Sequence, residues 1–144
     1  MPTVPPSFAA VPLPSRDETP LSPSLEGVGL ELSAPLSARA SLPICGSFEL
    51  DASIVNRFSC VVDEITLVAI DAESHRPFAA TLPRAERSSP IRLDESVPEL
   101  TYGGWFNVDL RALCGLPDEP ATYYVFALVA ELQSSVCRVS WEGP

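Results

Sequence analysis

The stretch that decides the fold is Glu119-Pro-Ala-Thr-Tyr-Tyr-Val125, which opens a long apolar strand after a short helical corner. Four of its residues, Glu119, Ala121, Tyr123 and Val125, alternate along the chain and so share one face of an extended strand. The apolar run continues through residues 122–129 and is followed by a second run at residues 135–141. Two such runs with a short polar break predict a β-hairpin.

This stretch resembles the tyrosine corner of immunoglobulin-like sandwiches. In that family an acid, a small residue, a tyrosine and a core residue alternate into a strand, and the tyrosine hydroxyl bonds back to the backbone of the preceding loop. Here Glu119 stands in place of the usual Asp, Ala121 of Gly and Val125 of Cys. The resemblance implies that Tyr123 or Tyr124 bonds to the backbone near residues 113–116, and the spacing favours Tyr123.

The rest of the chain fits an all-β sandwich of seven strands. Short runs lie between Pro, Ser and Asp clusters at the spacing of a sandwich. Ile44, Phe48 and Leu50, for example, alternate with polar residues as in a half-buried strand. Arg111–Leu116 predicts one helical turn that Gly115 and Pro117 end. The seven strands are expected at residues 27–33, 44–51, 60–71, 77–82, 104–110, 121–130 and 135–141.

The immunoglobulin-like likeness extends to the broad class, fibronectin-like domains included, and not to antibody domains. The third expected strand has no Trp, and Val125 excludes the inter-sheet disulfide. We therefore predict a seven-stranded, immunoglobulin-like, antiparallel β-sandwich over residues 26–144, preceded by an extended arm. Residues 83–103 are polar and predict a long surface connection with a short edge strand at residues 91–94.

Residues 1–25 contain seven prolines, and no apolar periodicity runs through them. Each proline removes a backbone donor and fixes φ, so neither a helix nor a central strand can continue through the segment. Such proline-rich arms dock at a low entropic cost, and they are a means by which one subunit reaches another. The alternative is a solvated tail. The candidate partner-binding side chains of this arm are apolar: Val4, Phe8, Val11, Leu13 and Leu21.

Composition excludes several classes of function. The chain has 144 residues, 46% of them hydrophobic, with 19 acids against 9 bases and no lysine. A net charge of −10 repels phosphate backbones, and the arginines are scattered, so nucleic acid is not an expected partner. No run is long and apolar enough to predict insertion into a membrane. No secretory signal is evident, so we expect synthesis in the cytoplasm, with the final compartment open and a virion or surface assembly among the options.

Neither a catalytic nor a metal site is expected. The single histidine, His75, lies between Ser74 and Arg76 in an expected turn, where neighbours in sequence cannot converge as a triad. The four cysteines lie far apart and form no Cys-x-x-Cys pair, so they predict free, mostly buried thiols rather than a zinc site. A calcium site built from the acidic loop ends is the open alternative to solvated surface charge. We expect no cofactor.

Trp105, Asn107 and Asp109 form the candidate binding surface outside the arm. If Phe106 and Val108 face the core, the period of two places these three side chains together on the outer face. An exposed Trp beside an amide and a carboxylate is typical of protein interfaces and of sugar-binding sheets. The preferred expectation is a non-enzymatic module that assembles with itself or with a larger protein scaffold, as capsid, decoration, sheath or appendage subunits do. A carbohydrate or small-ligand module is the alternative, and an enzyme ranks last.

Overall fold

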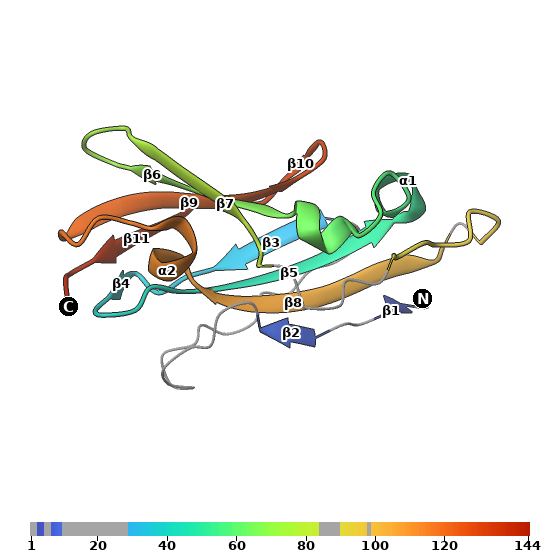
Figure 1. The fold of residues 1–144 in the computed structure, drawn as a ribbon, viewed down its shortest axis with the longest axis horizontal. Helices are drawn as coiled ribbons and strands as arrows, with labels where there is room; N and C mark the ends of the chain where they lie inside the picture. Colours follow the sequence, from blue (N-terminus) through green and yellow to red (C-terminus); the bar gives the residue numbers. More distant parts are fainter. Residues whose placement is uncertain (1–2, 5–6, 10–28, 84–89, 98) are drawn as a thin grey trace.

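The chain folds into two β-sheets packed face to face, as the computed structural model shows (Figure 1). The structure describes residues 3–4, 7–9, 29–83, 90–97 and 99–144, with only the backbone described at residues 3–4 and 7–9. The first sheet has the order β1-β8-β5-β3, and β2 also pairs with β8. Its strands are β1 (Thr3–Val4), β2 (Ser7–Ala9), β3 (Gly29–Ser33), β5 (Pro43–Asp51) and β8 (Thr101–Asp109).

The second sheet has the order β4-β11-β9-β6-β7, and β10 also pairs with β9. Antiparallel pairing joins β11 to β9, β9 to β6 and β6 to β7, whereas β4 and β11 are parallel. All seven expected strands have a counterpart in the two sheets, and the all-β sandwich is therefore confirmed. The strands of the second sheet are β4 (Ser37–Ala38), β6 (Thr66–Asp71), β7 (Pro77–Thr81), β9 (Ala121–Val129), β10 (Leu132–Gln133) and β11 (Cys137–Trp141).

Within the described residues, three short helical segments connect the strands: α1 (Ala52–Val55), η2 (Val61–Glu64) and α2 (Leu110–Cys114). The expected helical turn before residue 117 is α2, which Gly115 ends in the left-handed conformation at φ 64°. The expectation of a strand from residue 60 is wrong over residues 61–64, which form the 3-10 helix η2. A short apolar run suits a strand and a buried helical turn equally, and in the structure it forms the turn, with Val61 fully buried.

The core lies between the two sheets and holds the inward side chains of both. Trp141, Tyr123 and Phe106 are the largest side chains with at most 1% of their surface exposed. Gly46 and Phe106 are directly paired across β5 and β8, and the Phe106 ring occupies the space above the glycine. A Cβ atom on Gly46 would lie 2.1 Å from Cζ of that ring, so this close approach requires glycine.

Asn56 is one of the residues that attach the connection between β7 and β8 to the sandwich. Its amide donates to the Leu93 carbonyl at 2.9 Å, and its Oδ1 accepts from the Leu93 N–H at 2.8 Å, as a neighbouring strand would. Leu93 is 6% exposed and packs in the core. Residues 91–94 form no strand, so the expected edge strand is wrong. The Asn56 side chain pairs with the Leu93 backbone in place of a neighbouring strand. The sequence of residues 91–94 gives no sign of this distant partner.

Candidate functional site

Residues 3–4 and 7–9 lie on the outer edge of β8. β1 pairs with β8 in parallel, with Thr3 opposite Thr101, and β2 continues this pairing from Ser7 opposite Trp105 to Ala9 opposite Asn107. The other edge of β8 pairs antiparallel with β5 over all nine residues of both strands. Of the expected arm contacts, Val4 and Phe8 fall in these two strands, while Val11, Leu13 and Leu21 lie outside the described residues.

Trp105, Asn107 and Asp109 share the outer face of β8, as the period of two predicts. Phe106 and Val108 between them are fully buried, whereas Trp105 keeps 40% of its surface exposed. The structure thus brings the three candidate residues together beside the strand β2, which pairs with β8 at Trp105 and Asn107. The candidate binding surface and the docking edge for the N-terminal residues are therefore contiguous.

Asp109 and Asn107 differ in whether their side-chain oxygens have hydrogen-bond partners. Asp109 Oδ1 accepts the Leu42 N–H at 3.0 Å and the Arg111 N–H at 3.2 Å, and so caps α2 and links it to the residue before β5. The Oδ1 atom of Asn107 is buried and has no hydrogen-bond partner in the described part of the chain. Asp109 therefore has a structural task that sequence reasoning missed, although its place just before a helical turn is a signal for an N-cap.

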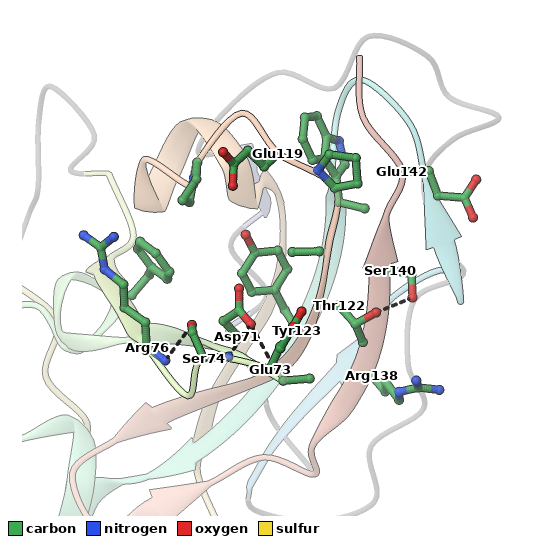
Figure 2. Close-up of a pocket in the computed structure, with 16 residues that line it drawn as sticks. Asp71, Glu73, Ser74, Arg76, Glu119, Thr122, Tyr123, Arg138, Ser140 and Glu142 are labelled. Carbon is green, nitrogen blue, oxygen red and sulfur yellow. Dashed lines mark hydrogen bonds between the residues drawn. The ribbon is translucent and has the colours of Figure 1, made fainter.

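A second candidate surface is the open groove at the end of the second sheet shown in Figure 2. It lies between the β6–β7 turn, the loop before β9 and the end of β11. Arg76 lies 4.9 Å above the Phe78 ring, and Thr122 and Ser140 share a hydrogen bond of 2.9 Å across the strands. Charges of both signs line it, and its described lining residues include no cysteine or histidine. The described lining residues therefore offer hydroxyl, carboxylate and guanidinium groups for polar contacts.

Tyr123 forms part of the groove wall, and its ring is 1% exposed. Figure 2 shows its hydroxyl pointing toward the segment that carries Glu119. Burial, followed by the charge of Asp71, raises the pKa of the Tyr123 hydroxyl. The expected bond to the backbone of residues 113–116 is not formed: within the described residues the hydroxyl has no hydrogen-bond partner. The ring is thus buried in the core, but the closing bond that a tyrosine corner requires is missing. Tyr124, the alternative, is 42% exposed.

The turn that borders the groove is organised by Asp71. Its carboxylate accepts the N–H groups of Ser74 at 3.0 Å and Glu73 at 2.8 Å, and these bonds hold the pKa of the Asp71 carboxyl below its usual range. His75 is exposed at φ 63° in the same turn, in agreement with the expected solvated turn. The carboxylate therefore has a structural role here.

The Asp71→Asn variant is expected to lose a pH-dependent part of this stabilisation. Asn keeps the shape and one acceptor but not the charge, so the wild type should melt at the higher temperature at pH 7. Because the folded-state pKa is lowered, the stabilisation is present above the unfolded pKa of about 4 and is lost as the pH falls through the folded value. Thermal midpoints of both proteins between pH 7 and pH 2.5 measure this.

The control for the Asp71 experiment is Glu73→Gln, which removes the same charge from the same turn and leaves both bonds to Asp71 intact. A gap between wild type and Asp71→Asn that stays constant down to pH 2.5 would contradict the assignment.

All four cysteines are free in the structure. Cys45 is buried, whereas Cys60, Cys114 and Cys137 are only partly buried, so the expectation of mostly buried thiols holds in part. Burial raises the pKa of the Cys114 thiol to about 11, and burial together with the charge of Glu31 raises that of Cys137. A thiol with a raised pKa is rarely a thiolate at neutral pH, so these two side chains are poor nucleophiles.

The described residues contain no cluster of three or more His, Cys, Asp or Glu side chains that could hold a metal ion. No helix among them is long and apolar enough to cross a membrane. In comparisons with known proteins, no family model, curated protein or solved structure matches this chain. The functional proposal therefore depends on the residues and their geometry.

Proposed function

We propose that this protein is a non-enzymatic assembly module that joins a protein partner, either another copy or a larger scaffold, through its N-terminal residues 1–25. The observation that carries the proposal is the parallel pairing of β1 and β2 with the edge of β8. Strand addition of this kind gives affinity through main-chain hydrogen bonds and specificity through alternate side chains. Minor capsid, decoration, sheath and appendage subunits are the types of assembly subunit to which this proposal refers.

We also propose that the sandwich is immunoglobulin-like in its strand order. Immunoglobulin-type domains place strands A, B, E and D in one sheet and C, F and G in the other. Assigning β3, β5 and β8 to A, B and E, and β6, β9 and β11 to C, F and G, reproduces the order of these six strands, while strand D has no counterpart and β4, β7 and β10 are additional strands of the second sheet. Strand D would come from the segment between β7 and β8, but residues 90–97 form no strand.

The missing strand D supports an assembly role. In this assignment β8 is strand E, and the edge beside it is where strand D would pair. The residues found at this edge are Thr3–Val4 and Ser7–Ala9, which come from the far end of the sequence. An open edge of nine residues is a template for pairing with another chain, so a sandwich of this kind requires a covering strand. The N-terminal residues therefore fill a position that a partner chain can also fill.

Removal of residues 1–25 is expected to abolish assembly and leave a folded sandwich. The interior strands start at Gly29, so a chain that begins at Glu26 keeps its core, whereas the strand pairs that cover β8 are lost. If the partner is another copy, the solution mass of the full chain should exceed the 15.4 kDa of one copy, and that of the truncated chain should not. Sedimentation equilibrium measures both.

A synthetic peptide of residues 1–25 provides the matched test of the same edge. It should bind the truncated chain by main-chain pairing with β8, and a scrambled peptide of the same composition should not. A truncated chain that assembles with unchanged affinity, or one that does not bind the peptide, would contradict the proposal. The outer face around Trp105 would then be the better candidate surface.

The second candidate function is a carbohydrate or small-ligand module at Trp105 and Asn107. It is favoured by the exposed indole and by the Asn107 Oδ1 atom that has no partner among the described residues. Trp141 is 1% exposed, so fluorescence quenching by a glycan reports on Trp105. Saturable quenching that Trp105→Phe abolishes would favour the ligand module, and its absence across a glycan panel would favour assembly.

A further inference from the structure

We propose that the groove at the end of the second sheet binds a basic side chain, arginine or lysine, that an extended segment of a partner protein carries. The described residues that line the groove come from β6, β7, β9 and β11 and from the loops beside them, and none belongs to β8. The site therefore goes beyond the proposed function, because pairing at the β8 edge neither requires it nor supplies it.

Tyr123 places a polar atom in the wall of the groove, although the residue is only 1% exposed. Its hydroxyl forms no hydrogen bond within the described residues, and it points toward the segment that carries Glu119 (Figure 2). A hydroxyl that is largely shielded from water and has no partner costs free energy. A ligand group in the groove can complete it, since a tyrosine hydroxyl both donates and accepts.

The groove carries an excess of negative charge. Glu142 is paired with Arg39 at 3.6 Å, whereas Glu73 and Glu119 have no ion-pair partner within the described residues. Burial and then the charge of Asp71 raise the pKa of the Tyr123 hydroxyl, Arg111 lowers it, and Glu119 raises it again. Negative charge therefore acts at the unpaired hydroxyl, which favours a cationic ligand. Four carboxylates line the described groove against two guanidinium groups: Asp71, Glu73, Glu119 and Glu142 against Arg76 and Arg138.

Two walls of the groove are held in place by their own chain. The Asp71 carboxylate accepts two N–H groups at 2.8 and 3.0 Å and so fixes the β6–β7 turn. On the other side, Pro117 and Pro120 flank Glu119, and each proline fixes its own φ. Groups that are already positioned lose little conformational freedom when a ligand binds, so this arrangement favours binding.

The size of the groove favours a protein segment over a free ion. The groove has a volume of about 1260 Å³, which exceeds the roughly 300–1,000 Å³ of pockets for small molecules. Thr122 and Ser140 also line it, and their hydroxyls can bond to the main chain of a peptide. A basic side chain on an extended segment therefore meets the carboxylates while its main chain meets the hydroxyls.

The test titrates the isotope-labelled full chain with three capped pentapeptides that have arginine, lysine or glutamine at the centre and alanine elsewhere. Amide signals of residues 71–78, 119–123 and 138–142 should shift saturably with the two basic peptides and not with the glutamine peptide. Affinity should fall at least about tenfold as salt rises from about 0.01 M to about 1 M, because the Debye length falls from about 30 Å to about 3 Å. Equal shifts with the glutamine peptide, or no saturable shift with a basic one, would overturn the proposal.

Two substitutions assign the binding to the groove. Tyr123→Phe removes only the hydroxyl and should weaken binding of the basic peptides about tenfold, as expected for a lost hydrogen bond to a charged group. Glu119→Gln changes an exposed residue, so the core is unaffected, and it should weaken binding about threefold. The matched control is Glu99→Gln, which removes the same charge from an exposed position outside the described groove lining and should leave affinity unchanged.

Unchanged affinity in both Tyr123→Phe and Glu119→Gln, each with a folded amide spectrum, would overturn the site. Spermidine in place of the peptides tests for a free polyamine as the ligand. If spermidine binds as tightly as the basic peptides and shifts the same signals, the protein segment is the wrong occupant. Weaker binding of spermidine supports the segment, because a polyamine has no main chain to contact the hydroxyls.

Discussion

Gly46→Ala is expected to be among the most destabilising single substitutions in this chain, lowering the free energy of unfolding by about 3 kcal/mol or more. The new Cβ would lie 2.1, 2.5 and 2.6 Å from three ring atoms of Phe106. Both residues belong to nine-residue strands paired along their whole length, and Phe106 is fully buried. The ring or the paired backbone would therefore have to shift inside a close-packed core, which is costly.

Urea denaturation followed by tryptophan fluorescence measures this loss. The matched control is Gly46→Ala combined with Phe106→Leu, because the smaller side chain removes the overlap. We expect the double variant to be more stable than Gly46→Ala alone, although Phe106→Leu by itself costs stability through lost packing. A Gly46→Ala protein within about 0.5 kcal/mol of the wild type would show that the two strands are not in this register.

Arg111→Ala is expected to cost about 2 kcal/mol, because one guanidinium connects three segments at the end of the second sheet. It lies 3.7 Å above the Trp141 ring, donates to the Ala40 carbonyl at 3.2 Å and pairs with Asp118 at 3.1 Å. The Asp118 side chain is 79% exposed, so this pair contributes least, and the stacking on Trp141 contributes most.

Arg111→Lys is the control for that substitution. Lysine keeps the charge but lacks the planar guanidinium that stacks on Trp141 and donates several hydrogen bonds. The stability of Arg111→Lys should therefore fall between those of the wild type and Arg111→Ala. Urea denaturation gives the three free energies of unfolding, and Trp141 emission reports on the local change. Equal stability of the lysine variant and the wild type would show that charge alone matters at this position.

Local sequence patterns predicted the parts of the fold that depend on neighbouring residues. The alternation of Ile44, Phe48 and Leu50 predicted β5, and all three are buried. Gly115 before Pro117 predicted the end of α2, because only a residue that tolerates positive φ fits the left-handed cap. The outer-face grouping of Trp105, Asn107 and Asp109 followed from the period of two alone. These features require no knowledge of what lies opposite in space.

Tertiary structure alone decided the features that depend on residues distant in the sequence. Thr3 pairs with Thr101 in the structure, and no periodicity in either segment encodes that partnership. From the sequence alone, Gly46 is only a residue that weakens a strand, whereas the structure shows that the Phe106 ring occupies the space above it. The Tyr123 hydroxyl lacks the backbone bond that its motif implies. Strand neighbours and close contacts are set by global packing, because a strand's local pattern specifies which face it buries but not which strand covers its edge.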